Sequence, residues 1–283
     1  MKFIYKDKEY TLNDLEKEHK KFAKSIKNPS FLLSNRFPLT FAFDPGYNIA
    51  SDFFYDLYKQ ITSAKFALIM GHKKIHDRNF VNWESGATGQ YWLRFQYIKN
   101  SIIWYNSSFD ILLQTLWFGF SLYKRIKINK KRINEIDSSE TYKDLLTACT
   151  YSKVKKVLKQ INNPDSTDLL NEIDNYSKCN EREKINAWSN KLKHHGDFII
   201  SELYSPSFGM KTGKYNSIYS NPEINEIEKL IEILKKHHLK LLKLTKFIFD
   251  FFNFDFFEKE EINIADIPKE IEYKRIIIEN DCP

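Results

Sequence analysis

Glycine, proline and arginine are all scarce in this sequence. The shortages of glycine and proline argue against a disordered chain. The 283 residues include only eight glycines and eight prolines, whereas aromatic residues make up 16%. This composition excludes a disordered chain and favours helices around a packed core. The length allows one large domain or two small ones.

Arginine accounts for only seven of the 44 basic residues, although the net charge is +7. Arginine is the usual residue for forked contacts to phosphate groups, and a strong nucleic-acid footprint normally contains several. The charge therefore permits an RNA or DNA partner without requiring one.

Cysteines and long apolar runs are also few. Cys149, Cys179 and Cys282 are far apart, odd in number and in no metal-binding spacing, and no signal peptide precedes them. These features predict a reduced, cytoplasmic protein. The two longest apolar stretches, 102–123 and 241–257, are interrupted by polar or charged side chains, so they predict core helices and no membrane span. The sequence also has no phosphate-binding glycine loop, nucleophile elbow, haem signature or flavin signature, and we expect no cofactor.

Apolar side chains recur at helical spacing in three long segments. They step by three or four residues from Phe53 to Leu68, from Phe95 to Leu116 and from Ile224 to Phe252. This spacing predicts long helices from about residue 49, across 90–123 and from about 224. Shorter helices are predicted at 142–161, 168–176 and 180–195. Three long apolar seams together predict an up-and-down helical bundle.

Both ends of the chain carry signals for short β-structure. The opening residues "MKFIYKDKEY" predict a hairpin, and Thr11 with Asp14 predicts a capping box that starts a helix ending near Ile26. β-Branched runs near the end predict a closing strand. The predicted fold class is therefore mainly α, a helical bundle with short β additions at both termini. The predicted parts are a hairpin, helix and connector (1–46), the bundle (47–258) and a C-terminal extension (259–283).

The stretch "WSNKLKHHGDF", residues 188–198, stands out from the rest of the chain because it sets two adjacent histidines against a glycine. Asn180 is a suitable N-cap for its helix, and Gly196 suits the left-handed position after the last turn. Basic side chains in a last turn interact favourably with the helix dipole. The stretch is therefore either a functional site or a basic helix end on the surface.

The order of these parts resembles the HEPN superfamily, helical-bundle proteins common in bacterial defence and toxin–antitoxin systems. The resemblance covers roughly residues 47–257 and depends on the pair Asn106 and Asp110, the helix ending in "SNKLKHHG" and the final long helix. It implies a HEPN-like up-and-down bundle that acts as a homodimer on RNA. Many members cleave RNA without a metal, using an arginine, a following polar residue and a histidine a few positions later.

The resemblance also implies roles for individual residues. Histidine can transfer the proton of the ribose 2′-OH, which attacks the adjacent phosphate, while cations stabilise the developing charge. The implied catalytic residues are His194, His195 and Asn190, with Asn190 orienting the substrate. The implied substrate-binding residues are Lys191, Lys193, Asn106 and Asp110.

The arginine of the family motif is missing at the expected spacing. Arg182 precedes His194 by 12 residues, about 18 Å along one helix. Two functions therefore stay open. One is a catalytically silent module of a stress or phage-defence system that binds RNA, a nucleotide or a protein partner from the same operon. The alternative is an active metal-independent endoribonuclease that uses His194 or His195.

Other chemically versatile residues have simpler interpretations. His72 and His76 have the spacing of two metal ligands on one helix face, but they continue the apolar step from Leu68 and lack a zincin-type carboxylate. We predict core or helix-end histidines and no metal site. His238, on an apolar seam, is predicted to be a satisfied buried histidine. Trp188 is predicted to pack at a homodimer interface where two basic helix ends face a shared groove; the alternative is a monomer with Trp188 in its core.

Overall fold

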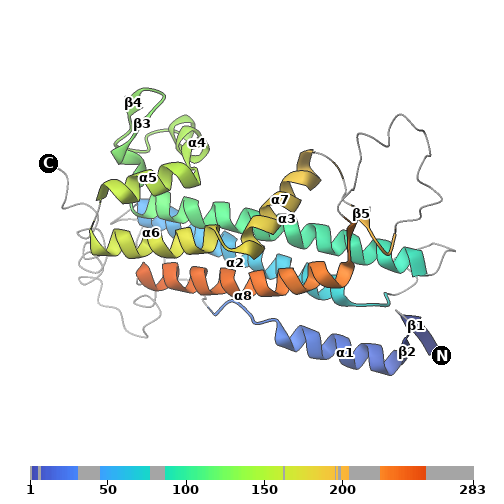
Figure 1. The fold of residues 1–283 in the computed structure, drawn as a ribbon. Coiled ribbons are helices and arrows are strands. Elements are labelled where there is room, and N and C mark those ends of the chain that lie inside the picture. The colour runs from blue at the N-terminus through green and yellow to red at the C-terminus, as the bar shows by residue number, and fades with distance from the viewer. Residues whose placement is uncertain are drawn as a thin grey trace, which may run out of the picture. The chain divides into compact units, whose positions relative to one another are not determined.

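The described part of the chain is mainly helical, which confirms the prediction of a mainly α fold (Figure 1). A computed structural model describes residues 2–5, 8–30, 45–76, 87–161, 163–194, 196, 199–203 and 224–252. The helices in these ranges are α1 (Leu12–Ser25), α2 (Pro45–His72), α3 (Ala87–Gly119), α4 (Ser139–Ala148), α5 (Tyr151–Ile161), α6 (Pro164–Ser177), α7 (Asn180–His194), α8 (Ile227–Phe251) and the 3-10 turn η3 (Leu122–Arg125). The strands are β1 (Lys2–Tyr5), β2 (Lys8–Thr11), β3 (Lys127–Ile128), β4 (Lys131–Arg132), β5 (Ile199–Ile200) and β6 (Ile224–Asn225). Across the described ranges, no helix has the length and apolar character needed to cross a membrane.

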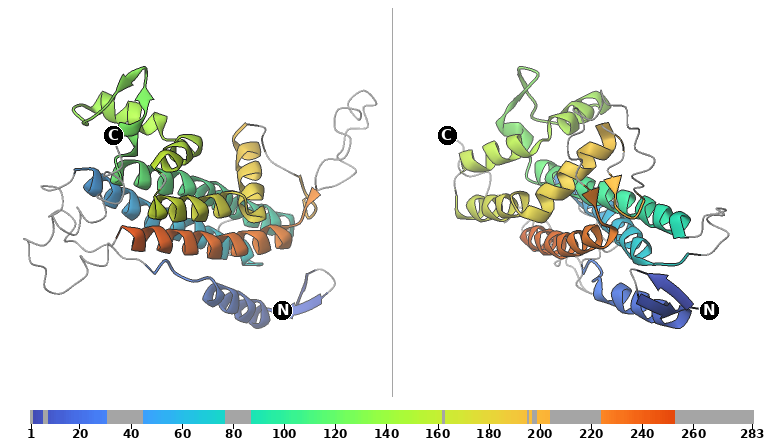
Figure 2. Two further views of the ribbon diagram at one scale, coloured as in Figure 1. Left: turned by 60° about the vertical axis from the view of Figure 1, so that its left-hand side comes forward. Right: turned by 45° about the vertical axis from the view of Figure 1, so that its right-hand side comes forward.

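The predicted N-terminal hairpin and capping box are both present. β1 and β2 pair antiparallel, with Lys2 opposite Thr11, and the hairpin leads into α1 (Figure 2). The Thr11 hydroxyl accepts the Asp14 N–H at 3.2 Å, while the Asp14 carboxylate accepts the Thr11 N–H at 3.0 Å. Two backbone donors at the start of α1 are thereby satisfied. The predicted C-terminal strand lies outside the described residues.

Several predicted boundaries are wrong, including the end of the helix predicted to residue 123, which is at Gly119, and the start of the helix predicted from residue 168, which is at Pro164. The helix predicted at 142–161 is two helices, α4 and α5, because Cys149 has an extended backbone that ends the first of them. The last helix begins at Ile227, and Ile224 and Asn225 instead pair in parallel with Ile199 and Ile200. Apolar spacing alone does not separate a two-residue strand from the first turn of a helix.

The chain divides into two compact units, each assembled from separate segments. Unit 1 contains residues 1–28, 62–106 and 180–239, and unit 2 contains residues 29–61, 107–179 and 240–283. Helices α2, α3 and α8 therefore each contribute residues to both units. The predicted boundaries near residues 46 and 258 stay a prediction.

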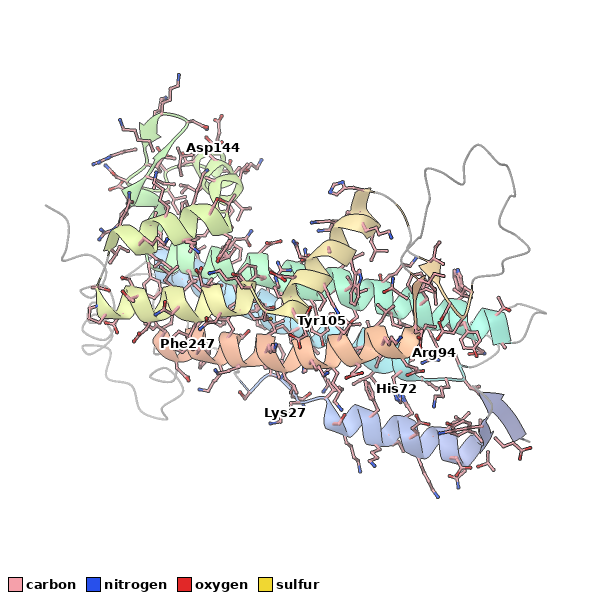
Figure 3. All side chains as sticks on the ribbon, in the orientation of Figure 1. Lys27, His72, Arg94, Tyr105, Asp144 and Phe247 are labelled. Carbon is pink, nitrogen blue, oxygen red and sulfur yellow. The ribbon has the colours of Figure 1, made fainter. Side chains whose placement is uncertain are left out.

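Unit 1 is held together by close packing and by one fully buried arginine. A Cβ atom added to Gly71 of α2 would lie 2.8 Å from Cγ1 of Ile98, so α2 and α3 pack against each other without space for a larger residue. Arg94 of α3 donates to the Gly71 carbonyl at 2.9 Å and pairs with Glu228 of α8 at 2.8 Å (Figure 3). The arginine thereby satisfies a carbonyl in the last turn of α2 and meets a carboxylate in the first turn of α8.

Unit 2 has an aromatic core. Phe120 and Phe252 stack with ring centroids 4.3 Å apart, and Phe54 meets Phe252 edge-on. A Cβ atom added to Gly119 would lie 2.5 Å from Cζ of Phe252 and 2.9 Å from Cβ of Ala50. Glycine is therefore needed at this position because the aromatic ring occupies the space of a side chain.

Asp174 of α6 joins α5 to α6 in the same unit. Its carboxylate accepts hydrogen bonds from the Tyr151 hydroxyl at 2.5 Å and from the Lys155 ammonium at 2.5 Å. Burial by itself favours the protonated acid, but the hydrogen bonds from Lys155, Tyr151 and Lys178 outweigh it and lower the pKa of Asp174 to about 2. The carboxylate therefore stays charged in the folded protein.

Candidate functional site

Helix α7, which carries the predicted motif, has one buried face and one exposed face. The buried residues are Arg182, Ile185, Trp188 and Ser189. Asn190, Lys193 and His194 are exposed and lie at positions i, i+3 and i+4, which share one side of a helix. Lys191 is half-buried. Three of the predicted residues thus share an accessible surface.

Arg182, which lies too far along the helix to serve as the family arginine, anchors α7 to α3. Its Nη1 donates to Oδ1 of Asn106 at 2.5 Å, and the two residues are 7% and 5% exposed. Asn106, predicted to bind substrate, therefore lies in the core of unit 1 and is not part of the exposed face of α7. Asp110, one turn further along α3, is exposed and belongs to unit 2.

The C-terminal end of α7 follows the predicted geometry. Gly196 has φ +83°, in the left-handed region that favours glycine. Glu181 and Glu183 occupy the first turn, and Lys191, Lys193 and His194 the last. This charge order complements the helix dipole and stabilises the helix whether or not the end has a function. His195 lies outside the described residues.

Trp188 is 6% exposed and belongs to the core of unit 1. A side chain buried within one chain contributes little surface to a second copy. The position of Trp188 therefore matches the core alternative, and a homodimer would form without the aromatic contact predicted for it.

His238 is a satisfied buried histidine, as predicted. Its Nε2 donates to the Lys27 carbonyl at 2.8 Å, because a carbonyl only accepts, and its Nδ1 then accepts the Tyr105 hydroxyl at 2.9 Å. Burial lowers the pKa of His238 to about 4, and the bond to the Lys27 backbone only partly offsets this effect. The ring is neutral at pH 7 and has a structural role.

His72 and His76 are buried, as predicted, but they do not share a helix face. His72 is the last residue of α2, and His76 lies beyond the helix in an irregular segment. Burial lowers the pKa of each ring to about 4. Throughout the part of the chain that the structure describes, no three histidine, cysteine or acidic side chains are grouped closely enough to hold a metal ion.

A pocket of about 370 Å³ lies between α1 and residues 73–76, all within unit 1. Leu12, Leu15, Glu16, His19 and Lys20 of α1 line one side, and Lys73, Lys74, Ile75 and His76 line the other. This site was not predicted from the sequence because more than 50 positions separate the two segments. Of the residues that line the pocket, the sequence pattern singled out His76 alone, as one of the pair His72 and His76.

Comparisons of the chain with protein-family models, with curated proteins and with solved structures found no match. The resemblance to the HEPN superfamily therefore depends on the motif and on the helical architecture alone.

Proposed function

We propose that the chain is a catalytically silent HEPN-like module of a bacterial stress or defence system that binds RNA through the exposed end of α7. The observation that carries this proposal is the placement of Asn190, Lys193 and His194 on one accessible helix face. Lysine ammonium groups bind phosphates as point charges, and an amide or imidazole adds hydrogen bonds that position the backbone. The basic side chains of the last turn outweigh the partial negative charge of about one half that a helix C-terminus carries.

The position of Arg182 favours binding over cleavage. Its guanidinium is buried and bonded to Asn106, so α7 offers no accessible arginine fork for a scissile phosphate. Lysine cannot reproduce the two parallel hydrogen bonds of that fork. A histidine without this partner lacks the charge stabilisation that RNA cleavage requires.

Fluorescence anisotropy with a labelled single-stranded RNA tests the binding. The Lys193→Ala/His194→Ala double variant should weaken binding about tenfold, and the slope of log Kd against log salt should fall by roughly 0.7 for each phosphate that is no longer bound. Lys184→Ala removes a positive charge from the exposed surface of the same helix and is the matched control. Equal RNA affinity in the double variant and in this control, or no binding at low salt, would reject the proposal.

Incubation of the same RNA with the protein in a chelator tests the alternative, a metal-independent endoribonuclease. We expect the RNA to stay intact. Fragments ending in a 2′,3′-cyclic phosphate that disappear in His194→Ala would instead establish cleavage through that histidine.

The proposal includes a homodimer in which each copy supplies one α7 end to the same RNA. Two ends double the positive charge available to a phosphodiester chain. Light scattering on the free protein and on its RNA complex measures the number of chains in each. One chain per RNA would remove the dimer from the proposal but would leave the proposed binding face of α7 unchanged.

A further inference from the structure

The basic hairpin, residues 124–132 of unit 2, concentrates positive charge on a short segment that contains β3 and β4. Six of its nine residues are lysine or arginine, and none is acidic. The hairpin lies next to α4 and projects beyond it (Figures 1 and 2). Five of the basic residues are exposed and make no ion pair with any described residue, namely Lys124, Lys127, Lys130, Lys131 and Arg132.

The turn and the inner face of the basic hairpin fix its conformation. Asn129 and Lys130 have φ of +50° and +67°, as the two central residues of a type I′ turn do. Nδ2 of Asn129 donates to the Asp144 carboxylate of α4 at 3.0 Å, and Asp144 lies beside the hairpin (Figure 3). Ile128 is only 5% exposed. One face of the hairpin therefore packs on unit 2, and the other faces solvent.

Two like charges are opposed on the solvent face. Lys127 pairs directly opposite Arg132 in the antiparallel register, and both side chains are exposed. Because side chains alternate along a strand, this pair lies on the face opposite to the buried Ile128. Like charges directly opposite each other destabilise a strand pair. An anion that binds both cations relieves this repulsion, so the arrangement favours an anionic partner.

The residue types of the basic hairpin restrict the kind of anion. It contains no aromatic side chain on which the bases of a single strand could stack. Ile126 is half-buried and Ile128 is buried, so no exposed apolar side chain is present to enter a lipid bilayer. These features favour the phosphate backbone of a nucleic-acid duplex, whose bases remain stacked on one another.

The two-stranded form of the hairpin favours DNA among duplexes. The major groove of B-form DNA is about 12 Å wide and admits a two-stranded ribbon. The major groove of A-form RNA is deep and narrow and does not admit side chains. Lys127 and Arg132 lie on different strands of the ribbon, so they can reach the two rows of phosphates that border the groove. Arginine can also donate two parallel hydrogen bonds to one phosphate.

We propose that the basic hairpin binds duplex DNA at the major groove. Lys127 and Arg132 bind phosphates on the two sides of the groove, and Lys130 at the turn adds a third cation. The Asn129 amide is bonded to Asp144, so the contact is with the backbone and does not depend on base sequence. The hairpin shares no residue with α7, and this proposal does not rest on the RNA-binding proposal.

Fluorescence anisotropy of the full chain with a short labelled DNA duplex tests the binding at low salt. An RNA duplex of the same sequence and one DNA strand alone should each bind at least about tenfold more weakly. Vesicles that contain phosphatidylserine should not retain the protein on sedimentation. An RNA duplex or single strand that bound as tightly as duplex DNA would overturn the groove contact. The absence of DNA binding, or retention on the vesicles, would overturn the proposal.

The Lys127→Gln/Arg132→Gln double variant assigns the binding to the basic hairpin. Its affinity for the DNA duplex should fall about tenfold, and the slope of log Kd against log salt should fall by about 0.9 for each phosphate that is no longer bound. Lys17→Gln/Lys21→Gln removes the same charge from exposed positions of α1 and is the matched control. Equal DNA affinity in the two double variants would overturn the proposal.

Two further measurements separate this site from α7 and from a loss of folding. The Lys193→Ala/His194→Ala variant should keep its full affinity for the DNA duplex, and a loss there would assign the binding to α7 instead. The hairpin double variant should unfold at a temperature no lower than that of the unmodified protein, because the opposed like charges are removed. A lower unfolding temperature would contradict the repulsion between Lys127 and Arg132.

Discussion

Nη1 of Arg182 lies 2.5 Å from Oδ1 of Asn106, and this bond joins the first turns of α7 to the middle of α3 inside unit 1. The two residues are 76 positions apart in the chain. Arg182 is on the buried face of α7, whereas Asn190, Lys193 and His194 near the C-terminal end of the same helix are exposed. The bond to Asn106 thus explains why no accessible arginine fork accompanies the basic helix end.

Replacing the buried arginine should destabilise the fold. Arg182→Ala removes a charged donor and leaves the Asn106 carbonyl buried without it, so the free energy of unfolding should fall by about 2–4 kcal/mol. Urea denaturation followed by circular dichroism measures the change. Arg132→Ala, at an exposed arginine on β4, is the control and should stay within about 0.5 kcal/mol. Equal stability of both variants would show that the bond to Asn106 contributes nothing measurable to the free energy of unfolding.

Acid should destabilise the protein through its buried histidines. Burial holds the folded-state pKa of His72, His76 and His238 at about 4, below the ordinary value of 6.5. Because the unfolded chain takes up these protons first, the stabilisation is complete above pH 6.5 and is lost as the pH falls toward 4. Urea denaturation at several pH values in this window should show a steadily falling free energy of unfolding.

Substitution of His238 tests this linkage at one site. His238→Gln should reduce the slope of unfolding free energy against pH by up to about 1.4 kcal/mol per pH unit, the effect of one proton. A slope unaffected by His238→Gln would show that this ring is protonated equally in the folded and unfolded chains.

Two glycines should respond to alanine for different reasons. At Gly119 the new methyl group would overlap the Phe252 ring, so Gly119→Ala should cost about 1–3 kcal/mol or more despite the better helix propensity of alanine. At Gly196 no atom lies within 4 Å, and only the φ of +83° opposes a side chain. Gly196→Ala should therefore cost only about 1 kcal/mol. Thermal unfolding of the two variants compares these costs, and a larger loss for Gly196→Ala would contradict the packing argument.

The Asp174 carboxylate, which joins α5 to α6, should contribute more to the free energy of unfolding than an exposed carboxylate does. Asp174→Asn weakens the bonds from Lys155, Tyr151 and Lys178, and should reduce the free energy of unfolding by about 1–2 kcal/mol at neutral pH. Since the folded-state pKa is about 2 and the ordinary value is 3.8, the difference should be complete above pH 3.8 and shrink as the pH falls toward 2. Asp168→Asn, at an exposed position of the same helix, is the control. A difference that persisted at the acid end would assign the effect to side-chain shape and not to charge.

Local patterns in the sequence determined most of the secondary structure. Apolar steps of three and four residues located α2, α3 and α8, because a helix must bury one stripe of side chains. Thr11 with Asp14 marked the start of one helix, because their side chains satisfy backbone N–H groups a few residues away. The glycine at 196 marked the end of another, because it adopts the left-handed conformation that follows a last helical turn. The burial of His238 followed from its place on an apolar seam. All of these features depend on neighbours close in the chain.

Tertiary structure alone decided the pairings that give the candidate sites their chemistry. The spacing of Arg182, Ile185 and Trp188 places the arginine on the buried face of α7, but no local pattern identifies Asn106 as its hydrogen-bond partner. The short pairing of β5 with β6 and the pocket between α1 and residues 73–76 likewise join segments far apart in the chain. Periodicity predicts which face of a helix is buried. The residue that this face contacts depends on how whole helices pack, because side-chain shape and the satisfaction of buried polar groups act together.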